Sequence, residues 1–166
     1  HYISFRKRSI REIKTYQMRV TATVNDKVLQ KKIDKQLRDQ PRQIEKLLGK
    51  TAEFLMGLIK QRTQRGKSAD GSTFAPYKPE YKAYRRKKGR QVSFPDLNFS
   101  GNMLSNMTEK SDSKKAIIYF ASKAQAIKAV GNNKKRTFFA IGNRETSTII
   151  NFFAKEFKKV NKLIWV

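Results

Sequence analysis

Cysteine is absent from this 166-residue chain, and histidine occurs once, as His1. The absence of cysteine excludes disulfide bonds, thiolate nucleophiles and cysteine-ligated zinc sites. With one histidine, at the first position, we expect neither a Ser-His-Asp or Cys-His catalytic arrangement nor a metal site with several histidine ligands. Catalysis by cysteine or histidine is thus not expected, and we expect no cofactor.

Long apolar runs and glycine-rich loops are also missing. The longest apolar run, Ala116–Ala121, is far shorter than the roughly 20 residues that span a bilayer. Gly66, Gly71, Gly89 and Gly101 stand apart from one another, whereas nucleotide-binding loops need glycines at close, fixed spacing. We expect no transmembrane helix and no glycine-rich phosphate loop.

Acidic residues are scarce: 13 Asp and Glu stand against 38 Lys and Arg, which gives a formal net charge of +25. A small domain more often has a net charge of about 2 to 8 in magnitude, because a larger charge repels itself in the compact state. The sequence therefore predicts an acidic partner, either nucleic acid or an acidic protein surface.

Aromatic residues are plentiful, with 11 Phe and 6 Tyr, and they supply the apolar groups that disordered chains lack. A chain of this length is typical of one domain with a real core. We expect a basic N-terminal arm over residues 1–14, a single domain over 15–160 with a loop or extension at about 66–96, and a tail over 161–166.

Two stretches have helical periodicity, one from Pro41 to about Arg65 and one from about Glu145 to Val160. The first carries an apolar stripe made of Ile44, Leu47, Leu48, Thr51, Leu55, Leu58 and Ile59. Alternation over residues 15–24 predicts a half-buried strand, and a further helix is expected from about 25 to 39.

The middle of the chain predicts short elements joined by turns. Residues 66–79 form a long loop with Asp70-Gly71 as its turn, and a short helix begins near Pro79 and stops at Gly89. Ser100 is expected to cap another short helix that carries Met103, Leu104 and Met107.

Residues 116–121 predict a buried strand, and residues 136–141 an extended apolar segment after a polar turn at 131–133. Residues 122–130 fit either a helical turn or an irregular segment. The whole pattern indicates an α+β domain, in which the long amphipathic helix and the C-terminal helix pack on a small antiparallel or mixed sheet.

A basic segment follows the Asp-Gly loop, and three tyrosines at helical spacing, Tyr77, Tyr81 and Tyr84, run through it. Cations that neutralise phosphates, with rings that stack on bases, favour nucleic acid. Equally, tyrosines on one helix face are typical of a short helix docked on its own domain. The basic residues expected to contact DNA or an acidic partner are Lys78, Lys82, Arg85, Arg86, Lys87, Lys88 and Arg90.

One metal-dependent nuclease pattern is formally present, because Asp96 and the Glu156-Phe157-Lys158 triplet supply two acids and a lysine. In such sites the Glu-x-Lys element lies on a strand, whereas Glu156 falls in the expected terminal helix. We therefore treat the nuclease as a minor alternative.

The segment Ala69-Asp70-Gly71-Ser72-Thr73-Phe74-Ala75-Pro76, which follows a long amphipathic helix, resembles the tailed-phage virion-morphogenesis or tail-completion proteins. Those proteins have Pro-Asp-Gly, two residues, an aromatic residue and Pro-Leu at this place. Later landmarks come in the same order, from about Pro41 to Val160. Ala69 and Thr137 replace family prolines, and Lys128 replaces a common histidine. The matching positions are Asp70, Gly71, Phe74, Pro76, Leu97, Ser100, Gly101, Leu104, Arg136 and Phe138.

The resemblance implies a structural virion protein, not an enzyme, that forms a homo-oligomeric ring at the head-to-tail junction or tail terminus and completes or joins the tail. Its implied partners are other neck, portal or tail proteins, possible duplex DNA in the channel, and no membrane. It would lie in the virion, and in the host cytoplasm during assembly. Six copies of +25 would carry about +150, which needs acidic neighbours or DNA. The alternative is a non-enzymatic basic nucleic-acid-binding protein.

The resemblance also suggests roles for single residues. Phe74 and Pro76 would anchor the loop by packing, and Arg136 and Phe138 would fix the extended segment before the last helix. The segment from Ser68 to Arg90 would reach a neighbouring subunit or ring.

Overall fold

The computed structural model of the chain describes residues 31, 34 and 41–162. The expected basic arm (1–14), the strand at 15–24 and nearly all of the helix at 25–39 lie outside the described residues, as does the end of the tail (163–166).

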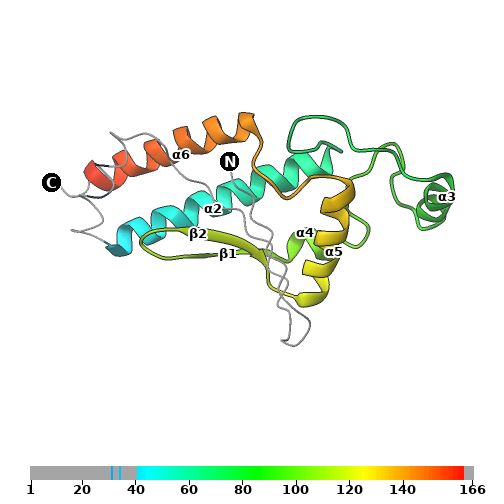
Figure 1. Ribbon diagram of the computed structural model, residues 1–166, viewed down its shortest axis with the longest axis horizontal. Coiled ribbons are helices and arrows are strands. Elements are labelled where there is room, and N and C mark those ends of the chain that lie inside the picture. The colour runs from blue at the N-terminus through cyan, green and yellow to red at the C-terminus, as the bar shows by residue number, and fades with distance from the viewer. Residues whose placement is uncertain (1–30, 32–33, 35–40, 163–166) are drawn as a thin grey trace.

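The body of the domain has three layers (Figure 1). Helix α2 (Pro41–Gln64) runs through the middle, and helix α6 (Asn143–Lys162) packs along one side of it. A hairpin of β1 (Met107–Ser111) and β2 (Ala116–Phe120) packs along the other side. The α+β prediction is confirmed, and both long helices begin and end within two residues of their expected bounds.

The apolar stripe of α2 explains why this helix lies at the centre. Ile44 and Leu47 form a small buried cluster with Phe153 and Phe157 of α6. Further along α2, the side chains of the stripe join the main core. Residues spaced by three and four face one side of a helix, but this stripe is broad enough to contact both the helix above it and the hairpin below it.

The main core joins residues that are far apart in the sequence. Its buried members are Ala52, Leu55, Ile59, Phe74, Met103, Leu104, Met107, Ile118, Phe120, Ala126, Ala129, Phe138, Phe139 and Ile149. They come from α2, the hairpin, α4, α5, α6 and the loops between them, so one core holds the described body together.

The hairpin is antiparallel, with Met107 paired to Phe120 and Ser111 to Ala116. Its turn is built by Asp112, whose Oδ1 accepts hydrogen bonds from the backbone N–H groups of Lys114 (2.7 Å) and Lys115 (3.0 Å). These bonds, the one from Lys114 first, hold the pKa of Asp112 below its ordinary value. The short strand at 107–111 was not predicted, because its mixed residues Thr108, Glu109 and Lys110 carry no apolar alternation.

Helix α5 (Lys123–Lys135) extends through the polar turn that was expected at 131–133, which corrects that prediction. Two asparagines explain the difference. Asn132 donates to the carbonyl of Lys128 (2.9 Å) within the helix, and Asn133 accepts from the backbone N–H groups of Phe138 (3.0 Å) and Phe139 (2.8 Å) beyond it. Asparagine is common in turns, but here both side chains lie in the last turn of α5, where they hydrogen-bond to backbone groups of the helix and of the segment that follows it.

Helix α4 (Asn102–Ser105) forms where a short helix was expected, but its N-cap residue is Gly101 and it has no side-chain cap. The prediction that Ser100 caps it is therefore wrong. Gly101 has φ +82°, a conformation that glycine adopts without strain. Of the expected helical residues, Met103 and Leu104 are in α4 and buried, whereas Met107 begins β1.

An arginine at the end of α2 fixes the chain before α6. Arg62 donates to the carbonyls of Phe138 (2.5 Å) and Ala140 (3.0 Å), and it forms an ion pair with Glu145. The same Glu145 oxygen accepts from the backbone N–H of Gly142 (2.8 Å), just before α6 begins. Residues 136–141 form an extended connection without strand pairing, and this arginine holds it against the body.

Candidate functional site

Residues 66–100, which we call the extension, leave the end of α2 and carry helix α3 (Pro79–Lys87) at their far end. Figure 1 shows α3 well away from α6 and the hairpin. Pro79 begins the helix and Gly89, at φ +64°, follows its last turn, as the sequence predicts. The domain therefore presents one projecting unit.

The Asp-Gly turn lies near the base of the extension. Asp70 Oδ1 accepts hydrogen bonds from the backbone N–H (2.9 Å) and the hydroxyl (2.7 Å) of Ser72, and these bonds hold its pKa below the ordinary value. Gly71 has φ +88°, which favours glycine. Asp70 is fully exposed and satisfied by its own loop, so this turn is structural.

The base of the extension is tied to the chain that precedes α6. The backbone N–H of Ala69 (2.8 Å) and the hydroxyl of Ser68 (3.1 Å) both donate to the carbonyl of Thr137. Arg136 donates in return to the carbonyl of Ala75 (2.9 Å). Two segments almost 70 residues apart in the sequence thus hold each other.

The loop anchors follow the prediction in part. Phe74 is buried, and the side chain of Phe138 is 0% exposed. Pro76, by contrast, is exposed, so its expected packing role is wrong. It lies between the buried Phe74 and the buried Tyr77, which leaves it on the outer side of the loop.

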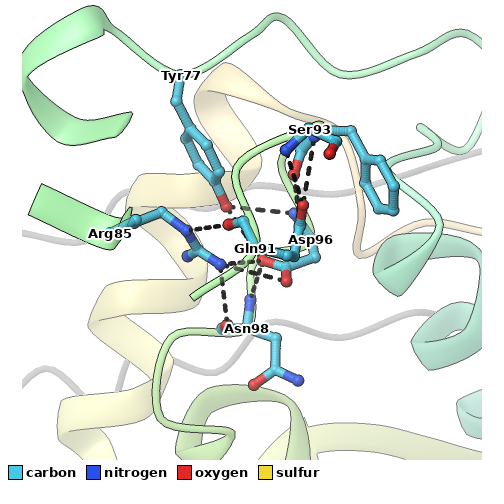
Figure 2. Close-up of polar contacts among 7 residues, drawn as sticks. Tyr77, Arg85, Gln91, Ser93, Asp96 and Asn98 are labelled. Carbon is cyan, nitrogen blue, oxygen red and sulfur yellow. Dashed lines mark hydrogen bonds and ion pairs between the residues drawn. The ribbon is translucent and has the colours of Figure 1, made fainter. Parts of the chain in front are cut away.

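An internal ion pair holds α3 to the irregular segment by which the extension returns to the body (Figure 2). The side chain of Arg85 is buried, with 1% exposed, and its Nη2 donates to Asp96 Oδ1 (3.1 Å) and Oδ2 (3.3 Å). Its Nε donates to the carbonyl of Gln91 (2.9 Å). Tyr77 adds its hydroxyl, which donates to Asp96 Oδ1 (3.1 Å). We call Tyr77, Arg85 and Asp96 the internal triad.

Burial raises the pKa of Tyr77 above its ordinary value of 10.0. The ring of Tyr77 also stacks under the guanidinium of Arg85, with 4.7 Å from the guanidinium carbon to the ring centroid. Such cation–π contacts strengthen when water is excluded. The internal triad is therefore a built-in clamp rather than a reactive group.

This burial corrects the prediction that Arg85 contacts a partner. Its guanidinium is used inside the extension and is not available at the surface. The other predicted cations divide by exposure: Lys82 is half-buried, and the exposed ones are Lys78, Arg86, Lys87, Lys88 and Arg90.

The tyrosine stripe divides in the same way. Tyr77 is buried, whereas Tyr81 and Tyr84 are 40% and 47% exposed. The ring of Tyr84 stacks with two others, with centroids 6.1 Å from Tyr81 and 5.6 Å from Phe99. The guanidinium of Arg90 lies 5.7 Å from the Phe99 centroid. The interpretation that the tyrosines dock a short helix on its own domain thus holds for Tyr77. The rings of Tyr81, Tyr84 and Phe99 form a stacked surface instead.

Between the extension and α5 lies a groove of about 720 Å³. Rings from the extension line one wall, and cations from α5 and the chain after it line the other. No Asp or Glu is among its lining residues. The residues that carry the argument below are Lys78, Tyr84, Phe99, Lys128, Lys135 and Arg136.

Four family-like positions lie on the returning part of the extension and just after it, and three of them, Leu97, Ser100 and Gly101, line this groove. Leu97, with φ +50°, packs on the main core, and Leu104 is buried in that core. Ser100 is exposed and lines the groove beside Gly101. The matched positions thus surround one region, the junction of the extension with the body.

The structure does not bring the nuclease residues together. Asp96 is bound by Arg85 and Tyr77 in the extension. Glu156 lies in α6, as expected, and accepts from Lys159 (2.5 Å) and Lys50 (2.6 Å). Over the described residues, no group of three or more acidic or histidine side chains is arranged to hold a metal ion.

Comparison of the chain with protein-family models, with curated proteins and with solved structures gives no match in any of the three. Within the described part of the chain, no helix combines the length and apolar character needed to cross a membrane.

The internal triad and the α5 wall of the groove were missed by the sequence analysis. One signal was available for Arg85: it follows Tyr81 by four residues and Tyr77 by eight, so it shares the helix face that docks. No comparable signal linked Lys128 and Lys135 to the tyrosines, because only the fold brings α5 beside the extension.

Proposed function

We propose that this chain is a structural subunit of a tailed-phage virion, which forms a ring at the head-to-tail junction or tail terminus and completes or joins the tail. Such a subunit works through contacts with its copies and with other neck, portal or tail proteins. The resemblance rests on landmarks in order along the sequence, so their arrangement in space is the feature to weigh.

The observation that carries the proposal is the convergence of the matched positions. Phe74, Leu104 and Phe138 share one buried core cluster, although they span more than 60 residues. Arg136 binds the loop between Phe74 and Tyr77. The matched positions thus hold the base of one projecting unit. This arrangement supports the proposed family, because a ring subunit needs a firmly held unit to contact its neighbour.

The surface chemistry of the extension supports the same proposal. Four exposed cations cluster at the end of α3 and just after it: Arg86, Lys87, Lys88 and Arg90. Like charges in such a run repel one another, and no Asp or Glu occurs between Tyr81 and Ser93. An acidic protein surface or DNA that meets this end would relieve that repulsion.

A genetic test in a phage that carries this gene addresses the proposal directly. Particles made without the protein should accumulate as unjoined heads and tails, or with tails of abnormal length, under the electron microscope. Cryo-electron microscopy of complete particles should reveal this chain as a closed ring. Normal particles made without the protein, and its absence from purified particles, would show that the proposal is wrong.

A charge-neutral variant asks whether the extension makes the contact. Arg86→Gln, Lys87→Gln and Lys88→Gln together should reduce joining in a complementation assay. The matched control is Lys114→Gln, Lys115→Gln and Lys158→Gln, which removes three exposed cations elsewhere. Equal loss with both variants would mean that total charge, and not the extension, supports joining.

A basic nucleic-acid-binding protein is the second candidate, favoured by the same exposed cations and the net charge of +25. Its signature is duplex affinity that falls with salt, with a slope near −0.9 per phosphate neutralised. Loss of that binding in the extension variant, in a chain absent from particles, would favour this candidate.

A further inference from the structure

We propose that the groove between the extension and α5 binds an acidic segment of another protein, with carboxylates on its cationic wall and an apolar side chain against its rings. The inference deepens the proposed function and rests on it for the source of the segment, since a ring at a junction meets other virion proteins. It adds a site that the linear sequence did not indicate.

Charge is the first reason. Lys78 contributes from the extension, and Lys128, Lys135 and Arg136 contribute from the opposite wall and the chain after it. Lys128 and Lys135 are exposed, seven residues apart on one face of α5. No Asp or Glu lines the groove, and the buried carboxylate of Asp96 is already bound by Arg85. The groove therefore attracts anions and lacks a group of its own to neutralise them.

The rings of the extension stack on one another. Tyr84 stacks with Tyr81 and with Phe99, and the guanidinium of Arg90 lies near the ring of Phe99. Single-stranded nucleic acid is held by bases that stack on free aromatic faces. Here each ring gives part of its surface to a neighbour, and the exposed parts of Tyr81 and Tyr84 form an apolar patch that an apolar side chain can contact.

Size favours a peptide over a duplex. A volume of about 720 Å³ lies within the range of about 300 to 1,000 Å³ of small-ligand pockets. It accommodates a few side chains of an extended segment, whereas duplex DNA would meet only the rim. The buried Met103 and the half-buried Leu97 also line the groove, and they suit one apolar anchor.

A second copy of this chain is a poorer occupant. Copies of this chain meet in the proposed ring, but no two of its 13 acidic residues are closer than three positions in the sequence, so the chain offers no segment rich in carboxylates. The segment is therefore expected from a different protein, with several carboxylates and at least one apolar residue.

The test uses the full chain and a short fluorescein-labelled peptide of alternating glutamate and leucine, followed by fluorescence anisotropy at low salt. Lys128→Glu with Lys135→Glu should weaken binding by about tenfold or more, whereas Lys114→Glu with Lys115→Glu, an equal charge change in the exposed hairpin turn, should change it by about twofold or less. A glutamine-for-glutamate peptide, and a serine-for-leucine peptide, should each bind more weakly.

Several results would overturn the inference. One is an equal loss with both lysine pairs, which would mean general charge attraction. Another is duplex or oligo-dT binding that is tighter than peptide binding and is lost in the Lys128→Glu, Lys135→Glu variant, which would make the groove a nucleic-acid site.

A different result separates this inference from the proposed function. If peptide binding depends on Lys128 and Lys135 but the protein is absent from virions, the groove is a peptide site and only the proposed source of the segment is wrong.

Discussion

The buried Arg85–Asp96 pair gives the sharpest prediction of how the extension is held. Arg85→Met keeps much of the side-chain length and removes the charge and all the hydrogen bonds to Asp96, Gln91 and Asn98. Removing one partner of a buried pair typically costs about 3–5 kcal/mol, because the other charge is left uncompensated. Tyr77 and the backbone N–H of Asn98 still donate to Asp96, so we expect the lower end, about 3 kcal/mol.

That loss should be local. Helix α3 lies away from the three layers of the body, and the side-chain hydrogen bonds of the triad all join residues of the extension. A loss of stability confined to one unit raises the population of that unit's open state and leaves the rest of the domain folded. At 1.4 kcal/mol per tenfold, about 3 kcal/mol corresponds to a roughly 100-fold faster amide exchange.

Hydrogen–deuterium exchange with mass spectrometry measures this by region. Peptides covering α3 should exchange roughly 100-fold faster in Arg85→Met, while peptides from the middle of α2 should not change. Arg86→Met is the matched control, because Arg86 is the exposed neighbour. Unchanged exchange in α3, or an equal effect of both variants, would refute the idea that the triad holds the extension.

Three further predictions concern stability. Gly66→Ala and Gly71→Ala both put a side chain at positive φ, but only at Gly66 would the new Cβ lie 2.9 Å from an aromatic ring carbon. In denaturant unfolding, Gly71→Ala should lower the free energy of unfolding by about 1–2 kcal/mol, and Gly66→Ala should lower it clearly more. Phe138→Ala should lower the free energy of unfolding by about 3–5 kcal/mol in the same assay, since this side chain is fully buried. Hydrogen bonds, of which that from Lys159 has the largest effect, lower the pKa of Glu156 from 4.5 to about 2. The stabilisation from ionised Glu156 is thus present above pH 4.5 and is lost as the pH falls toward 2. Over that range the unfolding temperature of Glu156→Gln should fall less steeply with decreasing pH than that of the unsubstituted protein.

Each of these has a contrary outcome. Equal losses at the two glycines would mean that backbone conformation alone matters and that the segment around Phe94 and Pro95 yields. A small loss for Phe138→Ala would mean that the connection before α6 is not part of the core. If the unfolding temperature of Glu156→Gln falls with pH as steeply as before, the ion pairs of Glu156 with its two lysines do not form in solution.

The long helices could be predicted because their apolar spacing is a local property. The stripe from Ile44 to Ile59 satisfies the helical period within itself, and so does the run from Ile149 to Phe157. The hairpin was only half predicted. Residues 116–120 are apolar enough to be recognised, whereas 107–111 become a strand only because Met107 pairs with Phe120 and packs on α2.

The errors at the ends of short elements have a related cause. Asn133 is a good turn former by composition, yet here its side chain accepts backbone N–H groups from beyond the helix. Ser100 is a good cap by composition, yet the chain enters α4 through Gly101 at positive φ. Local preference is outweighed wherever a distant segment supplies the hydrogen bonds or fixes the entry angle.

For the candidate site, the sequence predicts which segment is basic but not which of its cations are free. Arg85 and its neighbour Arg86 have the same chemistry, and one is buried while the other is exposed. The difference depends on Asp96, which is eleven residues away and returns beside α3 only after the turn at Gly89. A charge run along a sequence therefore overstates the surface that a partner meets.

Five of the acidic residues are used by the fold itself, which bears on how the net charge of +25 is distributed. Of the 13 acids, Asp96, Glu145 and Glu156 are bound to cations of their own chain, and Asp70 and Asp112 build turns. Acids used in these ways support the fold, so they are not available to neutralise the exposed lysines and arginines around α3 and α5. Rearranging these five acids would weaken the extension or the core, so they are committed to the fold, and neutralisation of the exposed cations is what the proposed acidic partner would supply.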